Sequence, residues 1–104
     1  MISRHWSGIA ESEFGEDYVK HLREDTFVKI SAISGFIKAS IFSRQVGEGV
    51  EFLIVTSWDS MEAIKQFAGP DPDMAVVPDN VKKMMVRFDQ KVRHYEVIEE
   101  TKPI

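Results

Sequence analysis

Hydrophobic positions change spacing along the chain, and the changes predict a strand followed by a long helix. Ile2–Ala10 carries Trp6 and Ile9 among serine and glycine, a pattern weakly typical of a strand. Residues 11–33 then place apolar side chains every three or four positions, and acidic residues near the start favour a helix beginning there. Gly35 ends this helix, because glycine readily adopts the left-handed conformation that follows a helix C-terminus.

The middle of the chain predicts a β-hairpin. Residues 36–46 and 50–59 are predicted strands, joined through Gly47-Glu48-Gly49, whose glycines suit a tight turn. A dinucleotide-binding loop is the alternative, but such a loop carries a third glycine and opens a helix rather than a strand. The hairpin interpretation is therefore preferred.

Two shorter helices and a last strand complete the predicted order. Asp59 and Glu62 have the spacing of a capping box, so a helix is expected from there to Gly69-Pro70. Pro78 can open a further helix, whose apolar residues fall at the i, i+3, i+4 and i+7 positions of an amphipathic helix: Val81, Met84, Met85 and Phe88. Residues 91–99 alternate enough to form the last strand.

The order strand, helix, strand, strand, helix pair, strand predicts an α+β fold. Helices on one face of an antiparallel sheet give a ferredoxin-like βαββαβ sandwich with right-handed crossovers. The first and last strands then lie side by side, which brings the segments around Trp6 and His94 together, in a register that the sequence does not define. A chain of 104 residues has the size of one domain, 1–104.

Both central strands carry apolar side chains on both of their faces. A sheet covered by helices on one side is expected to have a polar second face. A bare second face here could expose several large side chains: Phe36, Phe42, Phe52, Ile54 and Trp58. Apolar patches of that size usually mark an interface. We therefore predict a homodimer in which two sheets pack face to face; a monomer that folds its loops across the sheet is the alternative.

The charge and the amino-acid composition argue against nucleic acid and membrane as partners. Thirteen Lys and Arg against seventeen Asp and Glu give a net charge of −4, whereas nucleic-acid binding normally needs a clustered basic surface. The absence of cysteine excludes disulfides and thiolate metal sites. The apolar run 52–55 is far shorter than the ~20 residues of a membrane span, and no secretory signal is visible at the N-terminus. These features predict a cytoplasmic protein that binds neither nucleic acid nor membrane.

Five segments, in order along the chain, resemble the antibiotic biosynthesis monooxygenase domain family. They are 35–37, 52–63, 67–69, 75–78 and 92–97, and the most specific pieces are Trp58-Asp59-Ser60-Met61-Glu62-Ala63 and His94-Tyr95-Glu96-Val97. The resemblance implies a dimeric α/β barrel with a pocket between helices and sheet in each subunit. It also implies a cofactor-independent monooxygenase that needs neither flavin nor metal. Its phenolic or quinone-like substrate would be deprotonated, and the carbanion would deliver an electron to O2.

Two other functions stay open at this point. The haem-degrading branch of the family has a tryptophan, a histidine and an asparagine, which correspond here to Phe67, to Val76 or Val77, and to a first strand without asparagine. All three positions depart from that pattern. A non-catalytic dimeric binding or scaffold protein is the other alternative: its side chains would fill the space between helices and sheet, whereas an enzyme needs a cavity of roughly 300 Å³ with convergent polar groups.

Two histidines are the candidate catalytic residues. His94 and Glu96 are two residues apart on one face of the last strand, and a nearby carboxylate makes an imidazole more basic. His5 lies on the neighbouring strand, where it and Trp6 face opposite ways, so only one of them can share a face with His94. A structural histidine is the alternative for His94. No metal site is expected, because the three histidines lack metal-ligand spacing.

The candidate substrate-binding residues could form the walls of a pocket for a planar aromatic compound: Trp6, Tyr18, Trp58, Phe67, Met84 and Tyr95. Packing in the core or at an interface is the alternative for the largest of them. His21 lies one step off the apolar stripe of the first helix and is expected in solvent. Arg4 and Arg93 could offer cations to a phenolate or carboxylate, with solvated edge charges as the alternative.

Overall fold

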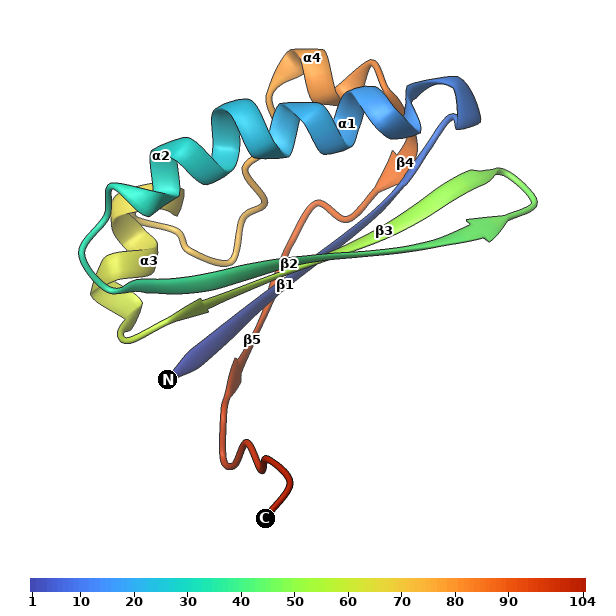
Figure 1. Ribbon diagram of the computed structural model, residues 1–104. Coiled ribbons are helices and arrows are strands. Elements are labelled where there is room, and N and C mark those ends of the chain that lie inside the picture. The colour runs from blue at the N-terminus through green and yellow to red at the C-terminus, as the bar shows by residue number, and fades with distance from the viewer.

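One five-stranded antiparallel sheet forms the base of the molecule, and helices cover one of its faces (Figure 1). The computed structural model describes residues 1–104. The strands are β1 (Ile2–Ala10), β2 (Phe36–Val46), β3 (Gly49–Trp58), β4 (Met85–Phe88) and β5 (Arg93–Glu96). The strand order is β2-β3-β1-β4, and β5 also pairs with β1. This arrangement confirms the predicted α+β sandwich and the pairing of the first and last strands, although β5 is shorter than the predicted 91–99.

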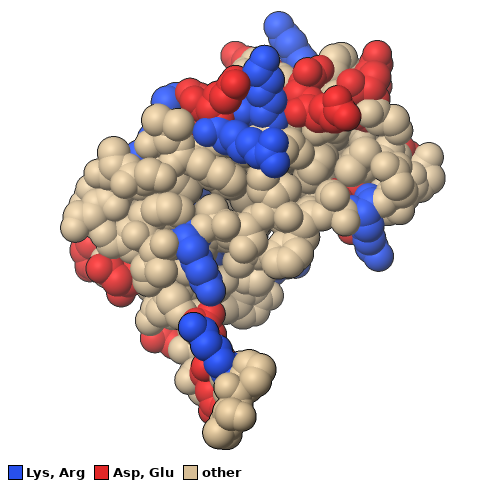
Figure 2. Space-filling model, in the orientation of Figure 1, with Lys and Arg blue, Asp and Glu red and all other residues tan.

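The helical layer is built from one long interrupted helix and two short ones. A 3-10 turn (Ser12–Phe14) leads into α1 (Gly15–His21), a π-helical turn (Leu22–Thr26) and α2 (Phe27–Ser31), followed later by α3 (Met61–Ala68) and α4 (Asp79–Lys82). Charged side chains gather over these helices and along the C-terminal tail, while the rest of this view is largely uncharged (Figure 2). None of the helices is long and apolar enough to cross a bilayer.

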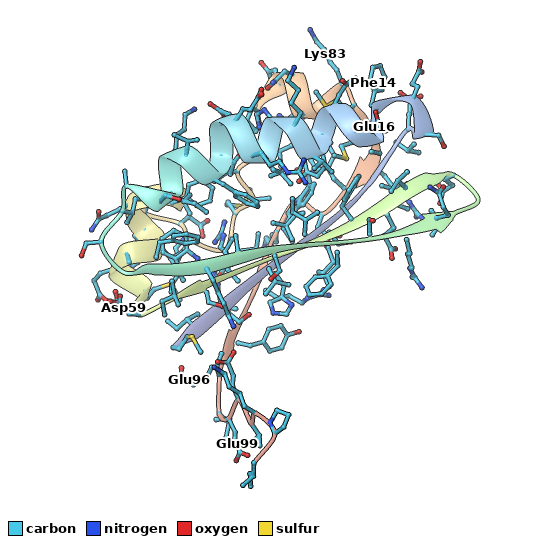
Figure 3. All side chains as sticks on the ribbon, in the orientation of Figure 1. Phe14, Glu16, Asp59, Lys83, Glu96 and Glu99 are labelled. Carbon is cyan, nitrogen blue, oxygen red and sulfur yellow. The ribbon has the colours of Figure 1, made fainter.

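The N-terminus of α3 is capped one residue later than predicted. The hydroxyl of Ser60 accepts a hydrogen bond from the backbone N–H of Ala63 at 3.2 Å, which makes Ser60 the capping residue. Asp59, the predicted cap, instead lies beside Gly35 at the end of β3 (Figure 3). Its backbone N–H donates to the Gly35 carbonyl at 2.8 Å, so the turn after α2 and the turn before α3 are tied together.

The prediction of an amphipathic helix reaching Phe88 was wrong. Only Asp79–Lys82 is helical, and Met85–Phe88 is strand β4, paired with the end of β1. The register places Ala10 opposite Met85 but Gly8 opposite Phe88, so Val86 is an extra residue in a β-bulge. Because of the bulge, side chains three residues apart share one face of the sheet, a spacing that resembles a helix in the sequence.

The apolar side chains of β3 lie mostly under the helices, not on the bare face. Phe52, Ile54 and Trp58 are at most 8% exposed, and the Phe36 ring packs edge-on against Trp58 with centroids 5.3 Å apart. Their predicted exposure on a second face was therefore wrong. A bulge between Phe36 and Lys38 rotates Phe36 toward the helices, leaving Phe42, 54% exposed, on the opposite face beside Leu53.

The core consists of two clusters that follow the two ends of the helical layer. The larger lies under α1 and α4 and contains Ala10, Tyr18, Leu22, Phe52, Ile54, Val81 and Met85. The smaller lies under α2 and α3 and contains Ile30, Trp58, Ala63 and Ile64. The core under the helices is therefore divided into two parts. Residues of both clusters line the site described below.

We predict that Gly49→Ala destabilises the protein by more than about 1 kcal/mol. Gly49 has φ of +154°, and a Cβ there would lie 2.1 Å from the backbone oxygen of Ala10, which cannot move without disturbing β1. Gly47→Ala is the matched control in the same hairpin, since a Cβ at Gly47 meets nothing within 4 Å. Urea unfolding checks both variants, and equal midpoints for the two would contradict the prediction.

Candidate functional site

A pocket opens between the helical layer and the helix-facing side of the sheet. Fifteen residues line it, eleven of them hydrophobic, and the polar ones are Arg4, His21, Thr26 and Thr56. No Asp or Glu side chain lines it. The pocket has a volume of about 70 Å³ and is open to solvent. The pocket is thus small, apolar and free of negative charge.

Aromatic side chains form one wall of the pocket. The Trp6 indole donates from Nε1 to the Asp89 carbonyl at 2.9 Å, and its ring lies 6.1 Å from that of Tyr18. A Cβ at Gly8 would come within 2.6 Å of the indole, so the glycine allows Trp6 to lie along β1. Sequence analysis predicted both Trp6 and Tyr18 as binding residues, and the structure brings them together here.

The Tyr18 hydroxyl is available to a ligand. Tyr18 is 3% exposed and its hydroxyl has no hydrogen-bond partner in the protein, yet no buried side-chain oxygen or nitrogen lacks a partner. The hydroxyl therefore keeps some accessible surface, and Tyr18 is one of the residues that line the pocket. Burial raises the pKa of Tyr18, so the group stays protonated and can donate a hydrogen bond.

Arg4 is the only cationic side chain in the lining, and it is 4% exposed. Its guanidinium donates to the carbonyls of Pro72 and Met74 and, at 2.9 Å, to Nε2 of His94. Its carbon Cζ lies 5.8 Å from the centroid of the Phe67 ring. Burial lowers the pKa of Arg4 to about 10, with Asp73 acting in the opposite sense. The group remains a cation at neutral pH.

The contact with Arg4 fixes the protonation state of His94. A guanidinium only donates, so Nε2 of His94 must accept and Nδ1 must carry the proton, which it donates to Asp73 Oδ1 at 3.2 Å. Burial and the charge of Arg4 lower the pKa of His94, and Asp73 offsets part of this effect. The carboxylate partner is thus Asp73 and not Glu96, which lies exposed next to the tail (Figure 3).

His21 faces the pocket, so its predicted position in solvent was wrong. Its side chain is 9% exposed, and Nε2 lies 3.2 Å from the Thr26 hydroxyl and 3.8 Å from an Asp25 carboxylate oxygen. On the other side, Nδ1 lies 3.4 Å from the Asn80 amide nitrogen. The π-helical turn brings residues five apart onto one face, a departure from helical spacing that no motif in the sequence announces.

The strand register decides which first-strand residue shares a face with His94. Arg4 lies opposite His94 and His5 lies opposite Arg93, so Trp6 faces the pocket and His5 faces the other side of the sheet. There, the ring of His5 packs edge-on against Tyr95 with centroids 4.9 Å apart, and Nε2 lies 2.8 Å from the Ser3 hydroxyl. His5 and Tyr95 are therefore outside the pocket.

The other predicted residues divide between the pocket and the core. Phe67 lines the pocket. Trp58 is fully buried behind it, with the two rings stacked at 6.3 Å and the indole N–H donating to the Thr56 hydroxyl at 2.8 Å. Met84 packs against the larger core cluster and does not line the pocket. No group of three or more histidine and carboxylate side chains is placed to hold a metal ion.

Solved structures with this fold match the chain over almost its whole length. One from Bacillus cereus, provisionally described as an antibiotic biosynthesis monooxygenase, is 17% identical with a TM-score of 0.70, covering 100% of this chain and 97% of that one. A monooxygenase from the gene ActVA-Orf6 of Streptomyces coelicolor, in complex with nanaomycin D, is 15% identical with a TM-score of 0.69, covering 99% and 92%.

A third match is the heme-degrader MhuD from Mycobacterium tuberculosis, with two hemes bound in its active site. It is 16% identical with a TM-score of 0.67, covering 98% of this chain and 100% of that one. No protein-family model and no curated protein sequence matches the chain. The chain therefore has the fold of these proteins, which confirms at the level of fold the resemblance seen in the sequence.

We predict that the protein loses stability as the pH falls below about 6.5 and that His94→Gln makes this loss shallower. Folding lowers the pKa of His94 below 6.5, its value in the unfolded chain. As the pH falls, His94 is therefore protonated more readily in the unfolded chain, and the free energy of unfolding decreases. His5, whose pKa is also lowered, adds to the effect. Glutamine can still accept from Arg4 but does not titrate. Urea midpoints between about pH 7.5 and about pH 5 check this, and parallel curves for the two proteins would refute it.

Proposed function

We propose that the protein is a cofactor-independent monooxygenase that binds a small aromatic compound, phenolic or quinone-like, in the pocket on the helix-facing side of the sheet. The observation that carries the proposal is the convergence of Arg4, His21 and the Tyr18 hydroxyl on an apolar space walled by aromatic rings. The shared fold with a monooxygenase bound to nanaomycin D supports a ring-shaped substrate. The other matched monooxygenase supports the reaction class.

The pocket residues suit a reaction that begins with removal of a proton. Trp6 and Phe67 would flank the ring, and the Tyr18 hydroxyl would donate to an oxygen on it. A base takes a proton from an activated CH2 group, and the carbanion passes one electron to O2. Recombination forms a C–O bond, and loss of water leaves a carbonyl. The carbon gives up four electrons, which reduce both oxygen atoms, so no external reductant is needed.

Within this proposal, His21 is the base and His94 positions Arg4. His21 lines the pocket, and its contacts are the Thr26 hydroxyl, the Asn80 amide and, at 3.8 Å, an Asp25 carboxylate oxygen. A substrate oxygen can replace the hydroxyl or the amide. Both ring nitrogens of His94 are already engaged, by Arg4 and by Asp73. The earlier prediction of His94 or His5 as the base stays a prediction, which the experiment below tests alongside His21.

The size of the cavity favours one second candidate function. A volume of about 70 Å³ is well below the roughly 300 Å³ expected for a pocket that encloses a whole substrate. Phe67, Val76 and Val77 are among the side chains that bound this space. This observation supports a non-catalytic dimeric protein that binds a small molecule or serves as a scaffold. Haem is larger still, and hemin addition with a search for a new Soret band tests that third option.

We also propose that the protein works as a homodimer through the bare face of the sheet. No helix covers this face, where Phe42 and Tyr95 are 54% and 50% exposed beside the partly buried Leu53 and Val55. A face of this kind gains most by packing against a second sheet, as the family resemblance also implies. The patch is smaller than the sequence suggested, because most of the large side chains lie under the helices.

We predict O2 consumption with anthrones, which carry an activated CH2 group, and a fall of about 100-fold or more in kcat for His21→Ala, as expected for loss of a general base. His94→Ala should raise KM more than it lowers kcat, because it acts through Arg4. His5→Ala is the control, since His5 lies on the other face. If His94→Ala or His5→Ala removes the activity and His21→Ala does not, the assignment of the base is wrong. Ligand binding without any O2 uptake would support the second candidate function instead.

We predict that sedimentation velocity at micromolar concentrations gives a dimer, and that Phe42→Glu converts it to a monomer. The substitution places a charge on the bare face, where it would be desolvated on association. Val28→Glu is the matched control, because Val28 is 62% exposed on α2 in the helical layer. A monomeric parent protein would overturn the proposed dimer.

A further inference from the structure

We infer that the pocket selects an anionic ring compound, an aromatic carboxylate or phenolate, whose charged oxygen pairs with Arg4. This inference deepens the proposed function and rests on the same pocket. It specifies the charge of the ligand, which the reaction class alone does not define. The argument depends on the partners of Arg4, on its free donors and on the lining around it.

The charge of Arg4 has no direct counter-charge. Its partners are two backbone carbonyls and the imidazole of His94, and none of them is a carboxylate. Asp73 is the nearest negative group in this network, and the ring of His94 stands between it and the guanidinium. A buried charge is costly unless it is paired. An anion in the pocket would supply the missing pair.

The guanidinium also keeps donors for such an anion. Arginine has five N–H groups, and Nη1 uses both of its hydrogens on Pro72 and His94, while Nη2 uses one on Met74. Nε has no partner in the protein, yet no buried side-chain nitrogen lacks a partner. Nε must therefore be accessible, and Arg4 lines the pocket. Nε–H and the second hydrogen of Nη2 are free to bind a carboxylate or phenolate oxygen.

The rest of the lining favours a negatively charged ring over other ligands. No carboxylate is part of the pocket lining, although the whole chain carries a net charge of −4. The remaining walls are apolar and aromatic, with Phe67 beside Arg4 and Trp6 on the same strand. An inorganic anion would satisfy the guanidinium but leave these walls in contact with water. A ring that carries the anion satisfies both.

Binding of salicylate and of its neutral amide, salicylamide, to the parent protein tests this inference without any substitution. Titration calorimetry should give a Kd about tenfold or more lower for salicylate, because only salicylate brings a charge to Arg4. Equal affinities would overturn the inference. So would inorganic phosphate binding as tightly as salicylate, because the ring would then contribute nothing.

Three variants locate the effect. Arg4→Met should remove the preference for salicylate, whereas Arg93→Met, on the opposite face of the same strand pair, should leave it unchanged. Asp73→Asn is the second test. It leaves the buried part of the site unchanged, because the Asp73 side chain is 69% exposed. It should tighten salicylate binding about two- to threefold by removing the charge that partly offsets Arg4, with Asp71→Asn as the matched control in the same loop.

A preference that survives Arg4→Met, or salicylate affinity that is unchanged in Asp73→Asn, would overturn the assignment to Arg4. These readouts are separate from turnover. Selective salicylate binding without O2 consumption by any substrate would support the anion site and count against the monooxygenase. Turnover of neutral phenols without a preference for anions would do the reverse.

Discussion

The helix-facing side of β1 carries large side chains at Arg4 and Trp6 and small ones at Gly8 and Ala10, and the pocket depends on that order. Ala10 is fully buried in the core, and Gly8 leaves room for the indole of Trp6 to lie along the strand. Arg4, at the other end, holds the loop after α3 through the carbonyls of Pro72 and Met74. Because β1 pairs with β3 on one side and with β4 and β5 on the other, it lies inside the sheet and places these groups under the helical layer.

The elements that the sequence predicts well are those set by local chemistry. The hairpin follows from its glycines, and the long helix follows from its apolar stripe and its C-terminal glycine. The errors occur where a β-bulge changes the face of a side chain. In β4 a bulge gives Met85 and Phe88 the spacing of a helix. In β2 a second bulge places Phe36 and Phe42 on opposite faces of the sheet. A bulge depends on the pairing partner, so a pattern within one segment does not reveal it.

The candidate site was predicted in part, and the reasons are similar. Trp6, Tyr18 and Phe67 were identified because aromatic residues suit both the wall of a pocket and a planar ligand. Arg4 was named only as a possible cation, since its burial depends on a strand register that pairs it with His94. His21 directly precedes a π-helical turn, which brings Thr26, five residues later, next to its ring; the apolar stripe of the sequence does not reveal this contact.

Arg4 links the shape of the pocket to its charge through different atoms of one side chain. Nη1 and Nη2 hold the carbonyls of the loop that continues to Val76 and Val77, which line the pocket. Nε faces no protein acceptor. Had a carboxylate replaced one of the loop carbonyls, the charge would be neutralised and the pocket would be apolar alone. The neutral carbonyls of Pro72 and Met74 hold the loop in the same geometry but leave the positive charge of Arg4 unpaired. The contact that shapes the pocket therefore also favours a negatively charged ligand.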